Sequence, residues 1–428
     1  MFIQPVKGVK MEMVVPGDKS ISHRSIMLSS IAEGESKIYN FLMGEDCLNT
    51  IDCFQKMGVE IVMGREYIKV GGVGLRGLQR PEERLDVGNS GTTIRLLSGI
   101  LAGQNFDCEI TGDASIQKRP MDRVIQPLRQ MGADIYGLEK ENYAPLAIKG
   151  KGRLKGIHYE MPVASAQVKS AILLAGLYGD GRTSLREFQQ SRNHTELMLK
   201  YMGGDIEVKG LEVVCRPVEK LQAREIFVPG DISSAAFFLV LGSILDDGEI
   251  RIKDVGLNPT RTGIIDVLLQ MGANIEVMHK KKCSGEQMGD IRVKRGMLRG
   301  IEIGGEIIPR LIDEIPAIAV AACFAEGTTV IRNAEELKVK ESNRIKAMVT
   351  ELKKLGAFIE ETKDGMMIQG GKALRGGRIE SYQDHRIAMS LTIAGLASKE
   401  GVEIDNPECV AISFPTFFDI VAKIMKNK

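Results

Sequence analysis

The tetrapeptide VPGD occurs twice in the chain, at Val15–Asp18 and at Val228–Asp231. The first copy continues as KSISHR, which is rich in cationic groups, and the second as ISSAAFF, which has none. The copies lie 213 residues apart, or three times 71, so the chain divides into two halves of similar design. Because proline fixes φ and glycine permits unusual backbone angles, this turn suits a crossover between domains, near residues 15 and 228.

A shorter phrase recurs within both halves at intervals of 69 to 84 residues. Each copy predicts the last turn of an amphipathic helix, a glycine cap and a strand. A helix rich in alanine, leucine and glycine stands before each copy and should be buried, because it is apolar nearly all round. The C-terminal FFDIVAKIMKNK predicts a sixth amphipathic helix. The five copies are FQKMGVEI at 54–61, LRQMGADI at 128–135, LKYMGGDI at 199–206, LLQMGANI at 268–275 and LKKLGAFI at 352–359.

These phrases predict six copies of one α/β unit, three in each half. The chain has 428 residues, more than one hydrophobic core usually serves, so we expect two domains. An open solenoid is the alternative, but solenoid repeats are usually about 20–45 residues long, which is shorter than these.

Composition narrows the possible partners. Lysine and arginine number 57 against 56 aspartates and glutamates, which argues against a nucleic-acid or membrane-surface protein. The seven cysteines contain no CxxC pair and the five histidines no HExxH pair, so we expect reduced thiols, a cytoplasmic location and no metal. The N-terminus lacks the apolar core of a signal peptide. GVGLRG at 72–77 fits GxGxxG but leads into a proline-containing stretch rather than a helix, so no dinucleotide cofactor is expected.

The turns before the buried helices are candidate anion sites, because a helix N-terminus presents free N–H groups and the positive end of the helix dipole. Ser20 and Arg24 are four residues apart on one predicted helical face, so both could hold one anionic group. Gly91, within NSGTT, would let a ligand approach the backbone closely. The second VPGD turn adds no such group. The full set at these turns is Lys19, Ser20, Arg24, Gly91, Ser165 and Gln167.

A second set of charged residues stands near the amphipathic helices and in the later turns. Its members are Arg119, Arg192, Asp313, Lys340, Glu341, Arg344 and Arg386. Arg119 precedes a proline at an expected helix start, and Lys340 and Arg344 lie one turn apart on an expected helix. A lone KxxxR pair is usually a solvated helix face, and Asp313 or Asp384 could simply cap a helix. Cations at equivalent ends of repeated units nevertheless favour a site for anions.

At this point the chain resembles the 5-enolpyruvylshikimate-3-phosphate synthase family (3-phosphoshikimate 1-carboxyvinyltransferases) over essentially its whole length. The motifs PGDKSISHR, NSGTT, QKRP, VKESNR and DHRIAMS carry the resemblance. SRNHTE and LIDEIP are similar to the bacterial branch called class II. The resemblance implies an α/β fold, the two-domain inverse α/β barrel of enolpyruvyl transferases, with six βαβαββ repeats. It places residues 15–227 in one domain and residues 1–14 with 228–428 in the other.

The resemblance also implies a reaction. The enolpyruvyl group of phosphoenolpyruvate passes to the 5-hydroxyl of shikimate 3-phosphate, phosphate leaves, and the product serves aromatic amino acid biosynthesis. Both substrates carry phosphate and carboxylate groups, so several lysines and arginines must converge in one cleft. We expect a cytoplasmic monomer with small anionic substrates, no cofactor, and no nucleic-acid or membrane partner.

By resemblance, the catalytic groups would be Asp313 as base toward the 5-hydroxyl, Glu341 as acid toward C3, and Lys19 in proton transfer. Shikimate 3-phosphate would be held by Lys19, Ser20, Arg24, Ser165, Gln167, Arg192, Asp313 and Lys340. Phosphoenolpyruvate would be held by Lys19, Gly91, Arg119, Gln167, Arg344 and Arg386. One departure stands out: many family members carry a lysine where AISFP places Ile412, so that cation is absent here.

Two alternatives remain open at this point. One is UDP-N-acetylglucosamine 1-carboxyvinyltransferase, which resembles this fold and uses the same enol donor. That enzyme characteristically has a cysteine in the loop where this chain has SIQKRP, and a Lys-Asn pair where this chain has Lys19 and Ser20. The other alternative is a non-catalytic repeat scaffold that binds an anion, and such a scaffold would not need Asp313 or Glu341.

Overall fold

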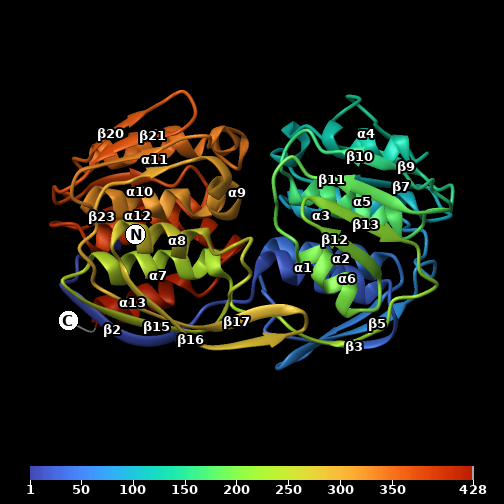
Figure 1. Cartoon of the computed structure of the whole chain (residues 1–428), viewed down its shortest axis with the longest axis horizontal. Helices are drawn as coiled ribbons and strands as arrows, with labels where there is room; N and C mark the ends of the chain where they lie inside the picture. Colours follow the sequence, from blue (N-terminus) through green and yellow to red (C-terminus); the bar gives the residue numbers. More distant parts are fainter. Residues whose placement is uncertain (427–428) are drawn as a thin grey trace. The chain divides into compact units, whose positions relative to one another are not determined.

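The computed structural model describes residues 1–426. The chain forms two compact units (Figure 1). One contains residues 17–228 together with 282–286, and we call it the 17–228 unit. The other contains residues 1–16, 229–281 and 287–428, and we call it the C-terminal unit. Each unit has its own hydrophobic core of buried aliphatic and aromatic side chains.

The 17–228 unit contains three four-stranded sheets with one shared topology. In each sheet the first two strands pair in parallel and the other pairs are antiparallel. The first sheet is β14 (Glu225–Phe227), β3 (Glu33–Tyr39), β5 (Tyr67–Val73) and β4 (Glu60–Met63). The second is β6 (Leu85–Asp86), β7 (Cys108–Thr111), β9 (Leu146–Lys149) and β8 (Asp134–Gly137). The third is β10 (His158–Glu160), β11 (Thr183–Arg186), β13 (Glu212–Arg216) and β12 (Asp205–Lys209).

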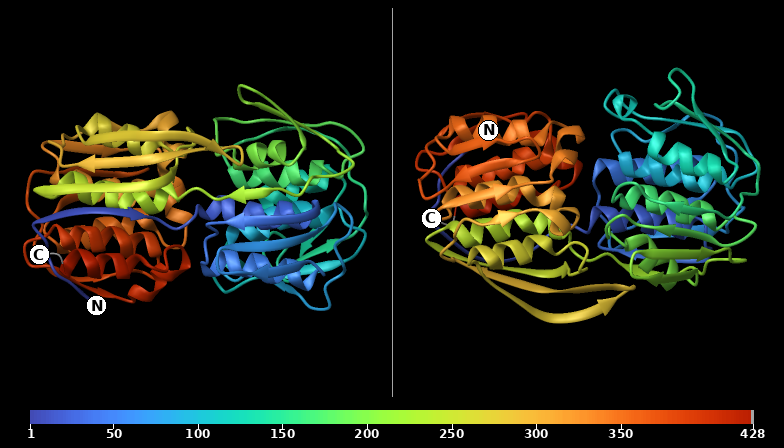
Figure 2. Two further views of the ribbon diagram at one scale, coloured as in Figure 1. Left: turned by 90° about the horizontal axis from the view of Figure 1, so that it is seen from below. Right: turned by 45° about the horizontal axis from the view of Figure 1, so that its top comes forward.

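The C-terminal unit repeats this plan, and its N-terminal strands complete two of its sheets (Figure 2). Strand β2 pairs in parallel with β15, and β1 pairs with β23 where the sixth repeat has no strand of its own. The first sheet is β16 (Asn274–Cys283), β17 (Glu286–Lys294), β15 (Asp247–Gly256) and β2 (Gly8–Val14). The second is β18 (Glu302–Ile303), β19 (Thr328–Ile331), β21 (Met366–Gln369) and β20 (Phe358–Glu361). The third is β1 (Phe2–Ile3), β23 (Val402–Asp405) and β22 (Gly377–Glu380).

Each unit has three helices in its core and three amphipathic helices around them. Five of the core helices are mainly apolar and α1 carries many polar side chains, but all six are buried on most of their faces. Helices α7, α10 and α12 are in mutual contact (Figure 1). The core helices are α1 (Lys19–Ser30), α3 (Gly91–Ala102), α5 (Ala166–Gly176), α7 (Ile232–Ile244), α10 (Ile315–Phe324) and α12 (His385–Leu396). The amphipathic helices are α2 (Glu45–Lys56), α4 (Asp122–Gln130), α6 (His194–Tyr201), α8 (Gly263–Met271), α11 (Arg344–Lys354) and α13 (Phe417–Lys426).

Polar caps fix where five of the core helices begin. A side-chain oxygen accepts a hydrogen bond from a backbone N–H of the first turn, which satisfies one of the donors that a helix start leaves open. Asp384 caps α12 in this way through the Arg386 N–H, as expected from the sequence. Helix α10 begins without such a cap and has a proline in its first turn instead. The other four caps are Asp18, Ser90, Ser165 and Asp231.

Candidate active site

The charged VPGD turn opens α1, which carries Lys19, Ser20 and Arg24 in its first two turns. Asp18 accepts from the Ile21 N–H at 2.9 Å, so the cap fixes the direction in which these side chains leave the helix. The Lys19 ammonium forms an ion pair with Asp46 of α2 and stays partly exposed. Lys19 is therefore held at the surface of the 17–228 unit rather than inside its core.

Arg24 is a buried cation whose hydrogen-bond partners are all neutral. The residue is only 4% exposed. Its Nε donates to Thr195 Oγ1 at 2.6 Å, and its Nη2 donates to Ser170 Oγ at 2.8 Å. Nη1 donates to the Ser20 carbonyl oxygen at 2.9 Å. Burial lowers the pKa of Arg24 to about 10, although the nearby Glu196 opposes the shift. Within residues 1–426 no carboxylate forms an ion pair with Arg24, so the guanidinium can accept an anion from outside.

The turn before α3 gathers a second pair of cations. Arg95 Nη1 donates to the Gly91 carbonyl oxygen at 3.1 Å and to Gln167 Oε1 at 3.0 Å. Arg119 Nη2 donates to the neutral oxygens of Asn89, at 2.8 Å, and Ser115. A Cβ added to Gly91 would lie 2.7 Å from Arg95 Nη1 and 3.2 Å from Arg119 Nη1. Gly91 therefore leaves room directly beside two guanidinium groups.

Ser165 starts α5, which packs against α3, and Arg192 lies near Arg24, where its charge helps to lower the pKa of that guanidinium. Ser165 is the N-cap of α5 and accepts from the Val168 N–H, so its hydroxyl lies at the helix start. Arg192 precedes α6, in the segment that also contains Ser191. Ser191 is anchored to Glu187, whose Oε1 accepts from both its N–H and its hydroxyl.

In the C-terminal unit the predicted residues gather around Arg344, the first residue of α11. Arg344 is 1% exposed; Nε donates to Asp384 at 2.8 Å, Nη2 to Glu341 at 2.6 Å and Nη1 to Asp313 at 3.2 Å. Burial lowers the pKa of this guanidinium, but the three carboxylates outweigh burial and raise it overall. Conversely, burial raises the pKa of Asp384, and Arg344 brings it below its ordinary value.

Asp313 is surrounded by cations. Its Oδ1 lies 3.2 Å from Arg344 Nη1, 3.9 Å from Arg386 Nε and 4.0 Å from Lys340 Nζ. Three cations at these distances favour the ionised carboxylate, which can accept a proton but has none to give. The side chain is 13% exposed, so it stays accessible from outside the core. Glu341 is more exposed and forms an ion pair with Arg344 at 2.6 Å.

Three comparisons with known proteins lead to the same family. The EPSP synthase (3-phosphoshikimate 1-carboxyvinyltransferase) family matches residues 3–421. A 3-phosphoshikimate 1-carboxyvinyltransferase of Thermoanaerobacter sp. (strain X514) is 57% identical over 413 residues, 96% of each chain. One of Bacillus cytotoxicus is 57% identical over 422 residues, 99% of each chain. A solved EPSP synthase of Acinetobacter baumannii has a TM-score of 0.90 at 45% identity, covering 99% of this chain and 97% of that one.

The chain belongs to the EPSP synthase family. It is a transferase of aromatic amino acid biosynthesis with the two-domain α/β fold of the enolpyruvyl transferases, and the resemblance noted from the sequence is confirmed. The family assignment also decides between the alternatives left open by the sequence, because it selects an enzyme over a scaffold and shikimate 3-phosphate over a UDP-sugar.

Two local predictions from the sequence were wrong. Lys340 and Arg344 do not share a helix face, because Asn343 caps α11 and Lys340 lies before it, at the end of a short 3₁₀ helix (Glu335–Val339). Lys340 instead pairs with Glu336 at 2.9 Å. Arg119 does not open a helix either: it ends the 3₁₀ helix Ile116–Lys118, and α4 begins three residues later. The proline after Arg119 separates these two helices rather than starting one.

The sequence reasoning also missed three charged residues, of which Arg261 and Glu314 are buried and Arg95 is half-buried. The VPGD turn of the fourth repeat was expected to add no charged group, and the cation of this repeat comes from elsewhere: Arg261, just before α8, donates to Asp231 at 3.1 Å and to Ser233 at 2.6 Å. Its signal was available, since Arg119 and Arg192 precede the equivalent helices. Arg95 is the only cation in the apolar helix α3, and Glu314, next to Asp313, is fully buried against Ser233.

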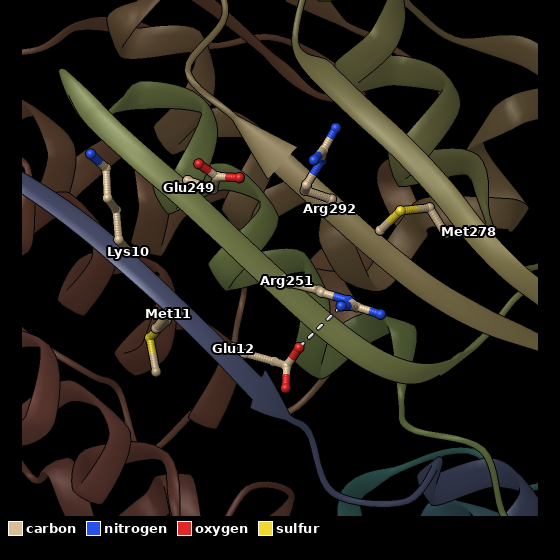
Figure 3. Close-up of a pocket in the computed structure, with 7 residues that line it drawn as sticks. All are labelled: Lys10, Met11, Glu12, Glu249, Arg251, Met278 and Arg292. Atoms are coloured by element: carbon tan, nitrogen blue, oxygen red, sulfur yellow. Dashed lines mark ion pairs between the residues drawn. The ribbon is translucent and has the colours of Figure 1, made fainter.

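Other parts of the chain carry no predicted site residue. Figure 3 shows a pocket on the outer side of the β2–β15–β17–β16 sheet, where Arg251 lies 3.3 Å from Glu12 in an ion pair. Ile412 ends a 3₁₀ helix (Pro407–Ile412) and is half-buried. Because the residue is an isoleucine, this position supplies no charge. Among the described residues no helix is long and apolar enough to cross a bilayer, and no three metal-ligating side chains are grouped.

His23 should make the folded chain sensitive to acid. Burial first, then Lys19 and Arg24, holds its pKa well below the ordinary 6.5. The unfolded chain therefore binds a proton near pH 6.5 that the folded chain does not bind, and the free energy of unfolding falls by up to about 1.4 kcal/mol per pH unit below that value. We expect His23→Gln to flatten the fall in denaturation midpoint between pH 7.5 and pH 5. The exposed His158→Gln is the control, and equal slopes in His23→Gln and the unmodified chain would contradict the expectation.

Proposed function

We propose that the chain transfers the 1-carboxyvinyl group of phosphoenolpyruvate to the 5-hydroxyl of shikimate 3-phosphate by addition and elimination, using its own side chains and no cofactor. The observation that carries the residue assignment is the contrast between two buried arginines. Arg24 has only neutral partners, whereas Arg344 is bound by three carboxylates. The first arrangement suits the capture of an anion, and the second suits the orientation of an acid and a base.

Shikimate 3-phosphate would be bound mainly through its phosphate and ring hydroxyls. An arginine has five N–H donors, and three of those of Arg24 are used, so Nη1 and Nη2 each retain one for the phosphate. Ser20, Ser165 and Gln167 would add hydroxyl and amide contacts, and Lys19 and Arg192 further positive charge. In the C-terminal unit Asp313 and Lys340 would contact the sugar-like ring at its reacting side.

Phosphoenolpyruvate would be bound by cations of both units. Arg119 and the backbone at Gly91 would serve it in the 17–228 unit, with Gln167 and Lys19 beside them. Arg386 and Arg344 would serve it in the C-terminal unit. Arg344 already donates four of its five N–H groups to carboxylates, so the contact would use the remaining one, on Nη1. Arg95, which contacts both Gly91 and Gln167, would be a further ligand of phosphoenolpyruvate.

The chemistry requires one base and one acid in the addition step. Asp313 would take the proton of the 5-hydroxyl as its oxygen attacks C2 of the enol, and Glu341 or Lys19 would give a proton to C3. In the elimination step C3 loses a proton, the C–O bond to phosphate breaks, and the nearby cations stabilise the departing anion. The proton that C3 loses returns to Glu341 or Lys19, and the hydroxyl proton held by Asp313 passes to the departing phosphate, so the protein ends each cycle unchanged.

We further propose that the chain works as a cytoplasmic monomer with residues 15–227 as one domain and residues 1–14 with 228–428 as the other. All seven cysteines are free thiols, which supports a reducing compartment. Every group assigned above belongs to a single chain, so the reaction needs no second copy.

The direct test is release of inorganic phosphate from phosphoenolpyruvate by the purified chain. We expect stoichiometric release when shikimate 3-phosphate is present and none with shikimate or UDP-N-acetylglucosamine in its place. Release with the UDP-sugar, or release without any acceptor, would contradict the proposal.

Gly91→Ala should weaken the phosphoenolpyruvate site specifically. The new methyl group would lie within 3.2 Å of the Arg95 and Arg119 guanidinium groups and push both aside. We expect KM for phosphoenolpyruvate to rise by roughly tenfold, as the loss of one charge-assisted hydrogen bond would produce. Inhibition by glyphosate, a family inhibitor, should fall as well. Gly181→Ala, where nothing lies within 4 Å, is the control, and unaltered inhibition in Gly91→Ala would refute the steric argument.

A further inference from the structure

We propose that Lys169 is a positioning residue that keeps Arg24 available to the substrate phosphate by binding the two carboxylates that would otherwise neutralise it. Lys169 was not among the residues expected from the sequence. The inference rests on the proposed role of Arg24 as a ligand of shikimate 3-phosphate and deepens it.

Lys169 is a fully buried lysine, with 0% exposure, on the core helix α5. Its Nζ lies 2.9 Å from Glu187 Oε2 and 2.7 Å from Glu196 Oε1, and donates to the Ser191 carbonyl oxygen at 3.4 Å. A lysine ammonium has three hydrogens, so this geometry uses all of them inside the protein. Lys169 therefore cannot itself bind a substrate and acts only through its neighbours.

The carboxylates that Lys169 holds lie next to the groups that hold Arg24. Glu196 follows Thr195, whose hydroxyl accepts from Arg24 Nε. Of the nearby charges, Glu196 has the largest effect on the pKa of Arg24, which it raises. Ser170, the residue after Lys169, accepts from Arg24 Nη2 and is hydrogen-bonded to Thr195 at 2.6 Å. One residue of α5 thus binds Glu196 and the next binds Arg24, which keeps these opposite charges on separate partners.

The four charges form a balanced buried group of two cations, Arg24 and Lys169, and two carboxylates, Glu187 and Glu196. If Lys169 were neutral, two carboxylates would remain in a region from which water is excluded, with Arg24 as an adjacent cation. A buried charge left unpaired is strongly unfavourable, so Arg24 would turn toward Glu196. In such a pair the carboxylate offsets the positive charge of the arginine, and fewer of its N–H groups remain to bind a phosphate.

Lys169 also fixes the segment that carries Arg192. One carboxylate oxygen of Glu187 binds Lys169. The other accepts hydrogen bonds from the Ser191 N–H at 3.0 Å and from the Ser191 hydroxyl at 2.5 Å. The loop between β11 and α6 is therefore tied to α5 at both Glu187 and Ser191. This second effect should likewise change binding of shikimate 3-phosphate rather than of phosphoenolpyruvate.

The test compares Lys169→Met with the double variant Lys169→Met/Glu196→Gln, in which the buried charges again balance. We expect Lys169→Met to raise KM and Kd for shikimate 3-phosphate by at least about tenfold, as truncation of a buried charge pair does. KM for phosphoenolpyruvate should change less than threefold. The double variant should recover most of the lost affinity, which loss of packing alone would not allow. Lys200→Met, which removes an exposed lysine of α6, is the matched control.

The outcomes separate the inference from the function it rests on. If the unmodified chain does not bind shikimate 3-phosphate, the proposed function fails. If Lys169→Met binds it with unchanged Kd, or loses affinity that Glu196→Gln does not restore, the inference on Lys169 fails. Should Lys169→Met not fold, the charge-balanced double variant carries the test. We expect it to fold and bind within about threefold of the unmodified chain, and loss of binding in the folded double variant would overturn the inference.

Discussion

Asp313→Asn is expected to lower kcat by roughly 10²–10⁴-fold, the contribution typical of a positioned general base. The asparagine oxygen can still accept the hydrogen bond from Arg344, and Arg386 still donates to the backbone carbonyl of this residue, so the side chain should keep its place. An amide cannot accept the proton of the 5-hydroxyl at neutral pH, so attack on C2 becomes slow. KM and Kd for shikimate 3-phosphate should change only a few-fold, because most of the proposed contacts to this substrate lie elsewhere.

Steady-state kinetics and calorimetric binding, performed on the same preparation, check this result. Asp419→Asn, an exposed aspartate of α13, is the control for the loss of one carboxylate from the C-terminal unit. Thermal denaturation should accompany both, since Asp313 also neutralises part of the Arg344 charge. Equal activity of Asp313→Asn and the unmodified chain would remove Asp313 from the mechanism. Loss of binding in proportion to loss of turnover would make it a ligand rather than a base.

The repeat pattern was sufficient to predict the core helices and the amphipathic helices of the units, although two helix starts were misplaced. Two features carried this prediction: the glycine after five of the six amphipathic helices, and the polar residue before each apolar helix. At Gly272, for example, φ is +100° at the end of α8, a conformation that favours glycine over other residues. Asp384 was expected to cap α12 and does so. These are local rules of backbone chemistry, and local rules can be applied to one sequence without knowledge of its tertiary contacts.

The missed and misplaced charges have a different physical origin. Arg95, Lys169 and Arg261 lie in or beside apolar segments, where their partners come from residues distant in sequence, such as Gln167 for Arg95. No spacing rule reveals such pairs, because they depend on tertiary packing. The Lys340–Arg344 prediction failed for a related reason: the spacing fitted a helix, but Asn343 starts the helix late by accepting from the Lys346 N–H.

Arg24→Lys is expected to raise Kd for shikimate 3-phosphate on the order of 10²-fold, although it preserves the charge. The guanidinium fills a fixed position because Nε, Nη1 and Nη2 each have their own acceptor, on Thr195, Ser20 and Ser170. That arrangement leaves one N–H on each of Nη1 and Nη2, and two donors on neighbouring nitrogens suit two oxygens of a phosphate. A lysine ammonium can replace one such contact but cannot keep the three internal acceptors satisfied at the same time.

Titration calorimetry with shikimate 3-phosphate and with shikimate distinguishes geometry from charge in this prediction. The Arg24→Lys penalty should be large for the phosphorylated ligand and small for shikimate, since only the phosphate uses the fork. Arg216→Lys, an exposed arginine paired with Asp205 and Glu207, is the matched control and should bind normally. If Arg24→Lys bound shikimate 3-phosphate as tightly as the unmodified chain, positive charge alone would suffice. The three neutral acceptors around Arg24 would then serve only the stability of the fold. A cation that binds phosphate through charge alone does not need them to fix its orientation.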